Sequence, residues 1–376
     1  MVKMKEKSKV YFTDFRARPG YNLLQKLEKL VRKAGIENID FENKYTAIKI
    51  HFGEPGNLAY LRPNYSKVIV DLVKKLGGKP FLTDCNTLYV GGRKNALDHL
   101  DSAYVNGYNP FTTGCHIIIA DGLKGTDEQY VEINQEYVKT AKIGRAIMDA
   151  DVIISLNHFK GHEGTGFGGA IKNIGMGCGS RAGKMEMHSS GKPNVIPENC
   201  RKCKQCIKIC AHGAISYNEE GKAVIDHNKC VGCGRCIGIC NFDAIKSPND
   251  EAADILNKKM AEYALAVVKD KPQFHISLIC DVSPNCDCHG ENDAPIVPNI
   301  GMLASFDMVA LDKACADLVN KQEVFENSYL AEQMKKGVHE KDLFHCNHPE
   351  TNWESQIEHG EEIGLGTKEY ELIEVK

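Results

Sequence analysis

The sequence has no long hydrophobic run and little net charge. Its apolar runs, such as residues 117–120, have the length of a strand, whereas a membrane-spanning helix needs roughly 18 apolar residues in succession. The formal net charge of −3 argues against nucleic acid as the main partner. We therefore expect a protein without a membrane span that does not bind nucleic acid.

A recognisable secretory signal is also lacking. The first ten residues are basic, but residues 11–15 provide no long apolar core to follow them. The 16 cysteines are therefore expected to be reduced rather than paired in disulfides. These features predict a cytoplasmic protein, and oxygen-sensitive metal clusters on its cysteines would favour an anaerobic setting.

Two cysteine runs with identical spacing are the strongest signal in the chain. They read Cys200-x2-Cys203-x2-Cys206-x3-Cys210 and Cys230-x2-Cys233-x2-Cys236-x3-Cys240. Bacterial-type ferredoxins hold two 4Fe–4S clusters with this spacing, and the fourth cysteine of each run binds the other cluster. We therefore predict two such clusters, one on Cys200, Cys203, Cys206 and Cys240, the other on Cys230, Cys233, Cys236 and Cys210. A zinc site would not need the repeated third and fourth cysteines.

The rest of the chain alternates strand-like and helix-like segments. Strands are predicted over residues 9–13, 46–52, 80–83, 116–120 and 152–156, and helices over 21–34 and 65–76. The pattern returns with a helix over 251–268 and strands over 275–280 and 308–311. Such alternation predicts an α/β fold with a mostly parallel layered sheet.

The cysteine module interrupts this α/β pattern. We therefore predict an α/β domain built from residues 1–192 and 250–345, with a ferredoxin-like module of two 4Fe–4S clusters inserted at 193–249. The C-terminal tail, residues 346–376, has mixed polarity and is not assigned to either.

Residues 157–179 form the richest polar segment outside the cysteine runs. They follow a predicted strand, where open α/β sheets bind their ligands. The glycines at 164, 166 and 169 match a dinucleotide fingerprint in spacing only, because polar residues separate them from the strand and the fingerprint needs a tight turn. We interpret them as an anion or substrate cradle of exposed N–H groups. His158 and His162 would share one face of a helix and bind a metal or move protons, or else be ordinary structural histidines.

Two more polar segments follow predicted strands. Residues 49–54 contain His51, a candidate base, and residues 83–93 contain acceptor groups with Tyr89 and Arg93. Both segments are equally typical of ordinary turns.

A third group of cysteines suggests an additional metal site. Cys286 and Cys288 are close enough to chelate one ion, and Cys280 at a predicted strand end would join them. His289 or Cys178 would supply a fourth ligand. The alternatives are cysteines that bind nothing and a redox-active thiol pair.

Several segments together resemble the DUF362 family of iron–sulfur proteins. The resemblance rests on residues 49–53, 86–89, 157–179, 181–185, 286–288 and 300–312, together with both cysteine runs. It implies a pair of 4Fe–4S clusters on an α/β scaffold and supplies no substrate.

The segment from His162 to Lys172 also resembles a histidine-to-lysine segment of nickel-pincer lactate racemases. In those proteins the matching lysine is tethered to the cofactor and the histidine stands in the site. We expect from this that His162 and Lys172 face one pocket.

These inferences predict an iron–sulfur oxidoreductase. Electrons would pass from a redox partner such as ferredoxin, through the two clusters, to a substrate or metal site in the α/β domain. His158, His162, Lys172 and His51 would bind or protonate a small anionic or carbonyl-bearing substrate. The alternatives are a non-catalytic electron carrier, a protein that assembles metal centres, and clusters that only stabilise the fold.

Overall fold

The structure is a computed structural model that describes residues 7–89, 91–188, 192–210, 212–230, 235–240, 242, 244–246, 253–338 and 341–376. The predicted cluster ligand Cys233 and the first two residues of the predicted helix 251–268 lie outside these ranges. No helix in the described part of the chain has both the length and the apolar character needed to cross a bilayer.

A large, mostly parallel sheet organises the fold. In the described residues its eight strands have the order β16-β1-β15-β14-β7-β2-β3-β4. All neighbours are parallel except for β15, which is antiparallel to both β1 and β14. The predicted α/β class with a mostly parallel sheet is thus confirmed. The strands are β1 (Ser8–Asp14), β2 (Tyr45–Lys49), β3 (Lys79–Asp84), β4 (Ile117–Ile119), β7 (Val152–His158), β14 (Gln273–Ile279), β15 (Gly301–Ser305) and β16 (Tyr370–Glu374).

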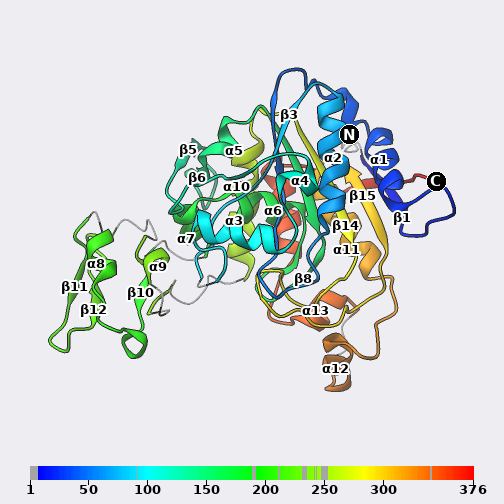
Figure 1. Ribbon diagram of the computed structural model, residues 1–376. Helices are drawn as coiled ribbons and strands as arrows, with labels where there is room; N and C mark the ends of the chain where they lie inside the picture. The colour runs from blue at the N-terminus through cyan, green and yellow to red at the C-terminus, as the bar shows by residue number, and fades with distance from the viewer. Residues whose placement is uncertain are drawn as a thin grey trace, which may run out of the picture.

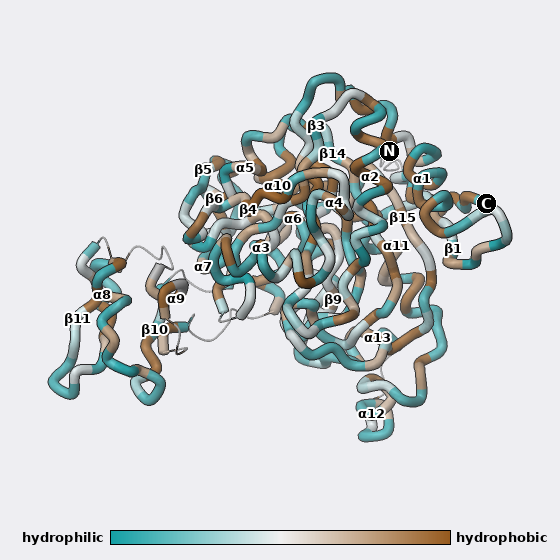
Figure 2. The backbone as a smooth tube through the Cα atoms, viewed as in Figure 1, coloured by the Kyte–Doolittle hydropathy of each residue, from teal (hydrophilic) through white to brown (hydrophobic). Residues whose placement is uncertain are grey.

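Helices cover both faces of this sheet (Figure 1). Along β2, Ala47 and Ile48 enter different hydrophobic cores, because successive side chains of a strand point to opposite faces. Figure 2 shows hydrophobic residues along the inner strands and the helices packed on them. One core includes α1 (Leu23–Lys33), α2 (Pro63–Lys75) and α3 (Ala96–Val105); the other includes α6 (Ala170–Cys178), α10 (Ala253–Val268), α11 (Met308–Val319) and α14 (Glu354–Glu362).

Local signals explain where the first helices begin and end. The Asn22 side chain accepts from the N–H groups of Leu24 and Gln25 and so caps α1. Gly35 and Gly77 follow α1 and α2 with φ of 93° and 83°, a conformation that favours glycine. The smaller elements are α4 (Pro110–Thr113), α5 (Arg145–Asp149), α7 (Arg181–His188), α12 (Tyr329–Lys335), α13 (Leu343–Asn347), β5 (Glu128–Glu132), β6 (Thr140–Gly144), β8 (Lys160–His162) and β9 (Gly166–Gly168).

One prediction about the second half of the chain was wrong. Residues 308–311, predicted as a strand, form the first turn of α11, because the Asp307 carboxylate accepts from Val309 N at 2.9 Å and Ala310 N at 3.0 Å. A short apolar run alone does not distinguish a strand from a buried helix. Residues 346–376, which the sequence pattern left unassigned, are part of the α/β body. They include α14, which packs on α10, and β16, which pairs in parallel with β1.

The residues between 192 and 246 form a small group of elements beside the α/β body (Figure 1). β10 (Asn194–Val195) pairs with β13 (Ile245–Lys246), and β11 (Ile215–Tyr217) pairs with β12 (Ala223–Ile225), both antiparallel. α8 (Gln205–Ile209) packs against α9 (Arg235–Ile239). Their hydrophobic core includes Met185 of α7, and Leu88 of the α/β body packs against it, so the insert is joined to the body by apolar contacts.

Candidate functional site

A cavity of the α/β body lies where four neighbouring parallel strands end. β14, β7, β2 and β3 are adjacent in the sheet, and the residues that follow them line a cavity of about 1070 Å³. This is the edge at which open α/β sheets bind ligands. Lys246 of the insert and Glu350 and Thr351 of the C-terminal segment also line it, so three parts of the chain build one pocket.

Buried ion pairs fix one wall of the pocket. Lys49 Nζ lies 2.9 Å from Asp84 Oδ1, and Arg93 Nε lies 2.8 Å from Glu54 Oε2. Burial raises the pKa of Asp84, but Lys49 and the neighbouring histidines outweigh it, and the net pKa lies well below the usual value. These charges are thus partnered and hold the strand ends in place rather than serving as free acids or bases.

His158 lies at the end of β7 and anchors the loop that carries Cys286 and Cys288. Its Nε2 donates to the carbonyl oxygen of Cys280 at 2.7 Å, and its Nδ1 lies 2.8 Å from Asp287 Oδ2. Both ring nitrogens therefore face oxygen atoms rather than the cavity. The arrangement makes His158 a positioning residue for the segment that carries Cys286 and Cys288.

The prediction that His158 and His162 share one face of a helix was wrong. β7 runs directly into a short hairpin made by β8 and β9, and His162 ends β8. Its Nδ1 accepts from the N–H groups of Gly164 at 3.0 Å and Thr165 at 3.1 Å, so the ring proton is on Nε2. Burial and the nearby Lys172 lower the pKa of His162 to about 3. His162 is therefore a neutral N–H donor in the pocket.

Four backbone N–H groups of the glycine-rich segment bind partners within the protein. Two of its amides bind His162, and the first amides of α6 bind the carboxylate of Asp312, with Ala170 N at 2.7 Å and Ile171 N at 2.9 Å. The predicted backbone cradle was thus wrong for these four amides. Their role is internal, because they fix His162 and the start of the helix that carries Lys172.

His162 and Lys172 both line the pocket, as the histidine-to-lysine segment led us to expect. Lys172 Nζ lies 3.7 Å from Cys286 Sγ. Burial lowers the pKa of Lys172, but the Cys286 and Cys288 thiols and Glu163 outweigh it, and the net pKa is raised. Lys172 thus remains a cation beside a thiol.

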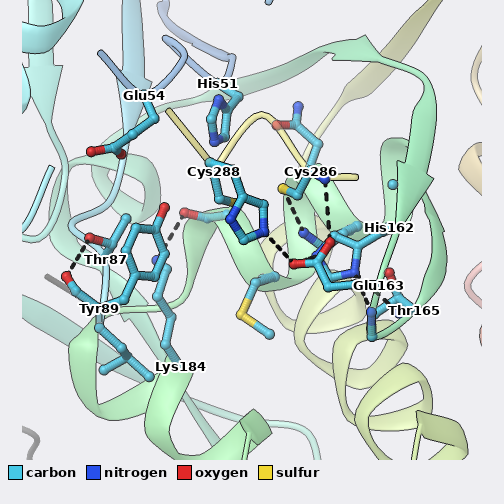
Figure 3. Close-up of a pocket in the computed structure, with 18 of the residues that line it drawn as sticks. His51, Glu54, Thr87, Tyr89, His162, Glu163, Thr165, Lys184, Cys286 and Cys288 are labelled. Atoms are coloured by element: carbon cyan, nitrogen blue, oxygen red, sulfur yellow. Dashed lines mark hydrogen bonds and ion pairs between the residues drawn. The ribbon is translucent and has the colours of Figure 1, made fainter. Parts of the chain in front are cut away.

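Three potential metal ligands meet beside Lys172 in the same pocket. One ligand atom each of His51, Cys286 and Cys288 lies within 4.8 Å of the others (Figure 3). A hydrogen bond from Cys288, with Lys172 nearby and burial opposing, lowers the pKa of Cys286 to about 6. Burial and Arg93 lower the pKa of His51 to about 4. The group combines an easily formed thiolate with a neutral imidazole.

His51 takes the place that the sequence interpretation gave to Cys280. The Cys280 side chain is buried in the other hydrophobic core, on the side of α1 and α2. His289 Nε2 pairs with Glu163 Oε1 at 2.9 Å, and Cys178 lies in the core that α6 shares with α10. The structure therefore brings together Cys286 and Cys288 as expected, but with a different partner.

Four predicted cluster cysteines line one small cavity of the insert. Cys200, Cys203 and Cys206 of the first run meet Cys240, the last cysteine of the second run. Backbone N–H groups point at two cysteine sulfurs: Ala223 N lies 3.5 Å from Cys200 Sγ, and Ala214 N lies 3.4 Å from Cys210 Sγ. In the second predicted set, Cys210 and Cys230 are half-buried and Cys236 is buried, whereas Cys233 is outside the described residues.

Some residues that line or support the pocket were not predicted from the sequence. Asp287, which supports it through His158, was not singled out because it lies between two cysteines, although an acidic residue in Cys-x-Cys is itself a signal. Asp312 had a weaker signal, at the end of a family-like segment. Glu350 and Thr351 had none, because they belong to a segment that periodicity did not assign.

Comparison with known proteins identifies a family whose model matches most of the chain. The model of a family described as Domain of unknown function (DUF362) matches residues 46–317. A thylakoid-associated protein of Synechocystis sp. is 27% identical over 124 residues, which are 33% of this chain and 35% of that protein.

Two solved structures resemble the chain at low identity. The lactate racemase apoprotein from Thermoanaerobacterium thermosaccharolyticum is 12% identical, with a TM-score of 0.40, and the match covers 83% of this chain and 57% of that one. A structural-genomics protein from Thermotoga maritima is also 12% identical, with a TM-score of 0.40, and the match covers 78% and 57% of the two chains.

Proposed function

The chain belongs to the DUF362 family, and we propose that it is an iron–sulfur oxidoreductase that delivers electrons into the pocket at the end of its parallel sheet. The cysteine module would receive the electrons, and the pocket would hold a small anionic or carbonyl-bearing substrate. When bound, 4Fe–4S clusters would supply single electrons.

The convergence of four cysteines from two separate runs is the observation that carries the proposal. Cys240 comes 34 residues after Cys206 and yet lines the same cavity as the first three cysteines of the other run. This is the crossed pattern that two 4Fe–4S clusters need. The residues fit such a group, because the described residues that line the cavity include four cysteines and no acidic side chain.

Direct contacts connect the insert to the pocket. Leu88 lines the pocket and packs against the core of the cysteine module. Lys94 donates to the carbonyl oxygen of Cys240, and Lys246 of β13 reaches the pocket wall. These contacts support a route for electrons from the cysteines to the pocket without a separate carrier.

The pocket offers donors that suit an anion or a carbonyl oxygen. His162 Nε2–H is a neutral donor, and Lys172 and Lys160 are nearby cations that also line the cavity. A neutral imidazole can polarise a carbonyl without giving up its proton first. Lys172 is placed to stabilise negative charge as electrons arrive.

The donor side of the insert is basic. Arg201, Lys202 and Lys204 flank Cys203, and all four residues are exposed. An acidic redox protein such as a ferredoxin would complement this surface, because opposite charges steer encounters at low salt. The three cations lie beside the cavity of the first cysteine set, where electron transfer would need the partner to dock.

Anaerobic electron transfer from a reduced acidic ferredoxin tests this proposal. We expect the ferredoxin to reduce the protein, as monitored by electron paramagnetic resonance. The rate of reduction should fall as the salt concentration rises, because the Debye length shortens. Replacing Arg201, Lys202 and Lys204 by Gln should slow the reduction at low salt and flatten its salt dependence. Lys124, an exposed lysine on the α/β body, gives a matched control as Lys124→Gln.

No electron uptake by protein that contains its iron would contradict the proposal. A rate independent of salt and of the three substitutions would contradict the docking surface. Unchanged rates in Lys124→Gln would show that the effect depends on where the charge lies.

A further inference from the structure

We propose that His51, Cys286 and Cys288 form a binding site for one thiophilic divalent cation such as Zn²⁺, separate from the cysteine runs. The three ligand atoms lie within 4.8 Å of one another at the end of the pocket. Two thiolates and an imidazole are ligands that Zn²⁺ prefers, and three protein ligands leave a fourth position for water or substrate. That position would face the cavity of about 1070 Å³.

The Cys-x-Cys loop is held in place before any ion binds. Glu54 N donates to Asp287 O at 3.1 Å, and the Asn57 side chain donates to His289 O at 3.0 Å. The Asp287 side chain turns away to His158, so Cys286 and Cys288 are left to face the pocket. Anchoring on both sides favours chelation by two fixed sulfurs over closure of a strained disulfide between near neighbours.

The imidazole of His51 gives an independent reason to place a ligand here. Its Nε2 is buried and makes no hydrogen bond of regular geometry among the described residues, where the Cys288 side chain is a weak polar neighbour of the ring. A buried polar atom without a partner is costly, and a metal ion between Nε2 and the two sulfurs would satisfy it. In the ion-free chain Gly53 N donates to Nδ1 at 3.0 Å, so binding through Nε2 requires the ring proton to move to Nδ1. The two thiolates should therefore contribute more to affinity than His51.

Neighbouring groups complete the surroundings of such an ion. Lys172 Nζ, 3.7 Å from Cys286 Sγ, would donate to a metal-bound thiolate, and Glu163 Oε2 accepts from Cys286 N at 3.3 Å. Hydrogen bonds of this kind orient ligands and tune the ion. The inference deepens the proposed function, since an ion here would polarise a substrate beside Lys172, but its binding does not depend on electron transfer.

Zinc binding by the full chain tests the site. Anaerobic protein is treated with a chelator, loaded with Zn²⁺, desalted, and analysed for zinc and iron. We expect about one zinc per chain in the unaltered protein and almost none in Cys286→Ser/Cys288→Ser, at equal iron content. Cys280→Ser, which changes a buried cysteine of the adjacent loop, should keep its zinc. X-ray absorption at the zinc edge should show two sulfur ligands at about 2.3 Å and nitrogen at about 2.0–2.1 Å.

Three results would overturn the site. The first is no retained zinc in the unaltered protein, and the second is equal zinc in the double variant. The third is a Kd for Zn²⁺, measured by titration, that is the same in His51→Ala as in the unaltered protein. Vacant cluster cysteines also bind zinc, so the site is judged from the zinc that is lost on going from the unaltered chain to Cys286→Ser/Cys288→Ser at equal iron content. A chain with full iron that retains no zinc would overturn the zinc site and leave the proposed function standing. A chain that takes up no iron would contradict the proposed function, and the loss of zinc in the double variant would still test the zinc site, so the two failures are distinguishable.

Discussion

At the scale of single residues, the pocket shows how one environment gives similar groups different roles. His158 has both ring nitrogens on oxygen atoms and positions a loop, whereas His162 has Nδ1 on two amides and Nε2 3.9 Å from Glu163 Oε1. Cys280 and Cys286 are both buried, yet burial raises the pKa of Cys280 to about 12 and hydrogen bonding lowers that of Cys286 to about 6. The difference lies in the donors around each sulfur.

The reactivity of Cys286 should therefore depend on pH in an unusual range. In chain freed of metal, alkylation of Cys286 by iodoacetamide should rise with pH and reach half its maximum near pH 6, since the thiolate is the reactive form. Cys288→Ala removes the hydrogen bond that lowers this pKa most, so its midpoint should move upward. The rate is followed by mass spectrometry of the peptide that contains Cys286.

Cys288→Ser keeps a donor at the same position and serves as the control. Its midpoint should move less than that of Cys288→Ala. A midpoint near the ordinary cysteine pKa in the unaltered protein, or equal midpoints in all three proteins, would contradict this interpretation of the pocket.

At the scale of elements, α6 is placed by a carboxylate from another helix. Asp312 of α11 accepts from the first two amides of α6, and a side chain at Gly169 would clash with it. Lys172 lies in the first turn of this helix, so the remote cap also positions a pocket cation. Asp312→Ala should lower the free energy of unfolding by about 1–2 kcal/mol, measured by urea denaturation.

The same carboxyl group should make stability depend on pH. Burial raises the pKa of Asp312 to about 7. The folded chain then holds this proton more tightly than the unfolded chain, so the stabilisation is complete below about pH 4 and is lost as pH rises through 7. Asp312→Asn cannot ionise and should show a flatter dependence over this window. An identical slope in both proteins would argue that Asp312 does not titrate there.

At the scale of the whole molecule, much of the fold could be predicted from local patterns. Alternating segments and terminal glycines such as Gly35 were sufficient for the parallel strands and the first helices. The position of β16 was not predictable. Its partner β1 lies more than 350 residues away in the sequence, and the residues of β16 do not indicate with which strand it pairs. The prediction of a strand over residues 308–311 failed, because the Asp307 side chain caps a helix there and this interaction outweighs the apolar character of the residues.

The candidate site divides in the same way. The spacing of the cysteine runs is local, and it was readable from the sequence. The meeting of His51 with Cys286 and Cys288 joins segments more than 230 residues apart, and it arises only because the strands before them, β2 and β14, end at the same edge of the sheet. Chemistry of single segments could suggest each residue, but only the strand order brings them together.

Iron and acid-labile sulfide in anaerobically purified full-length chain test the central claim most directly. Two 4Fe–4S clusters predict about eight irons and about eight sulfides per chain. Cys206→Ser should lower both values, whereas Cys115→Ser, at a buried cysteine of the α/β body, should leave them unchanged. Far less iron and sulfide in the unaltered chain, even after anaerobic reconstitution, would contradict the account.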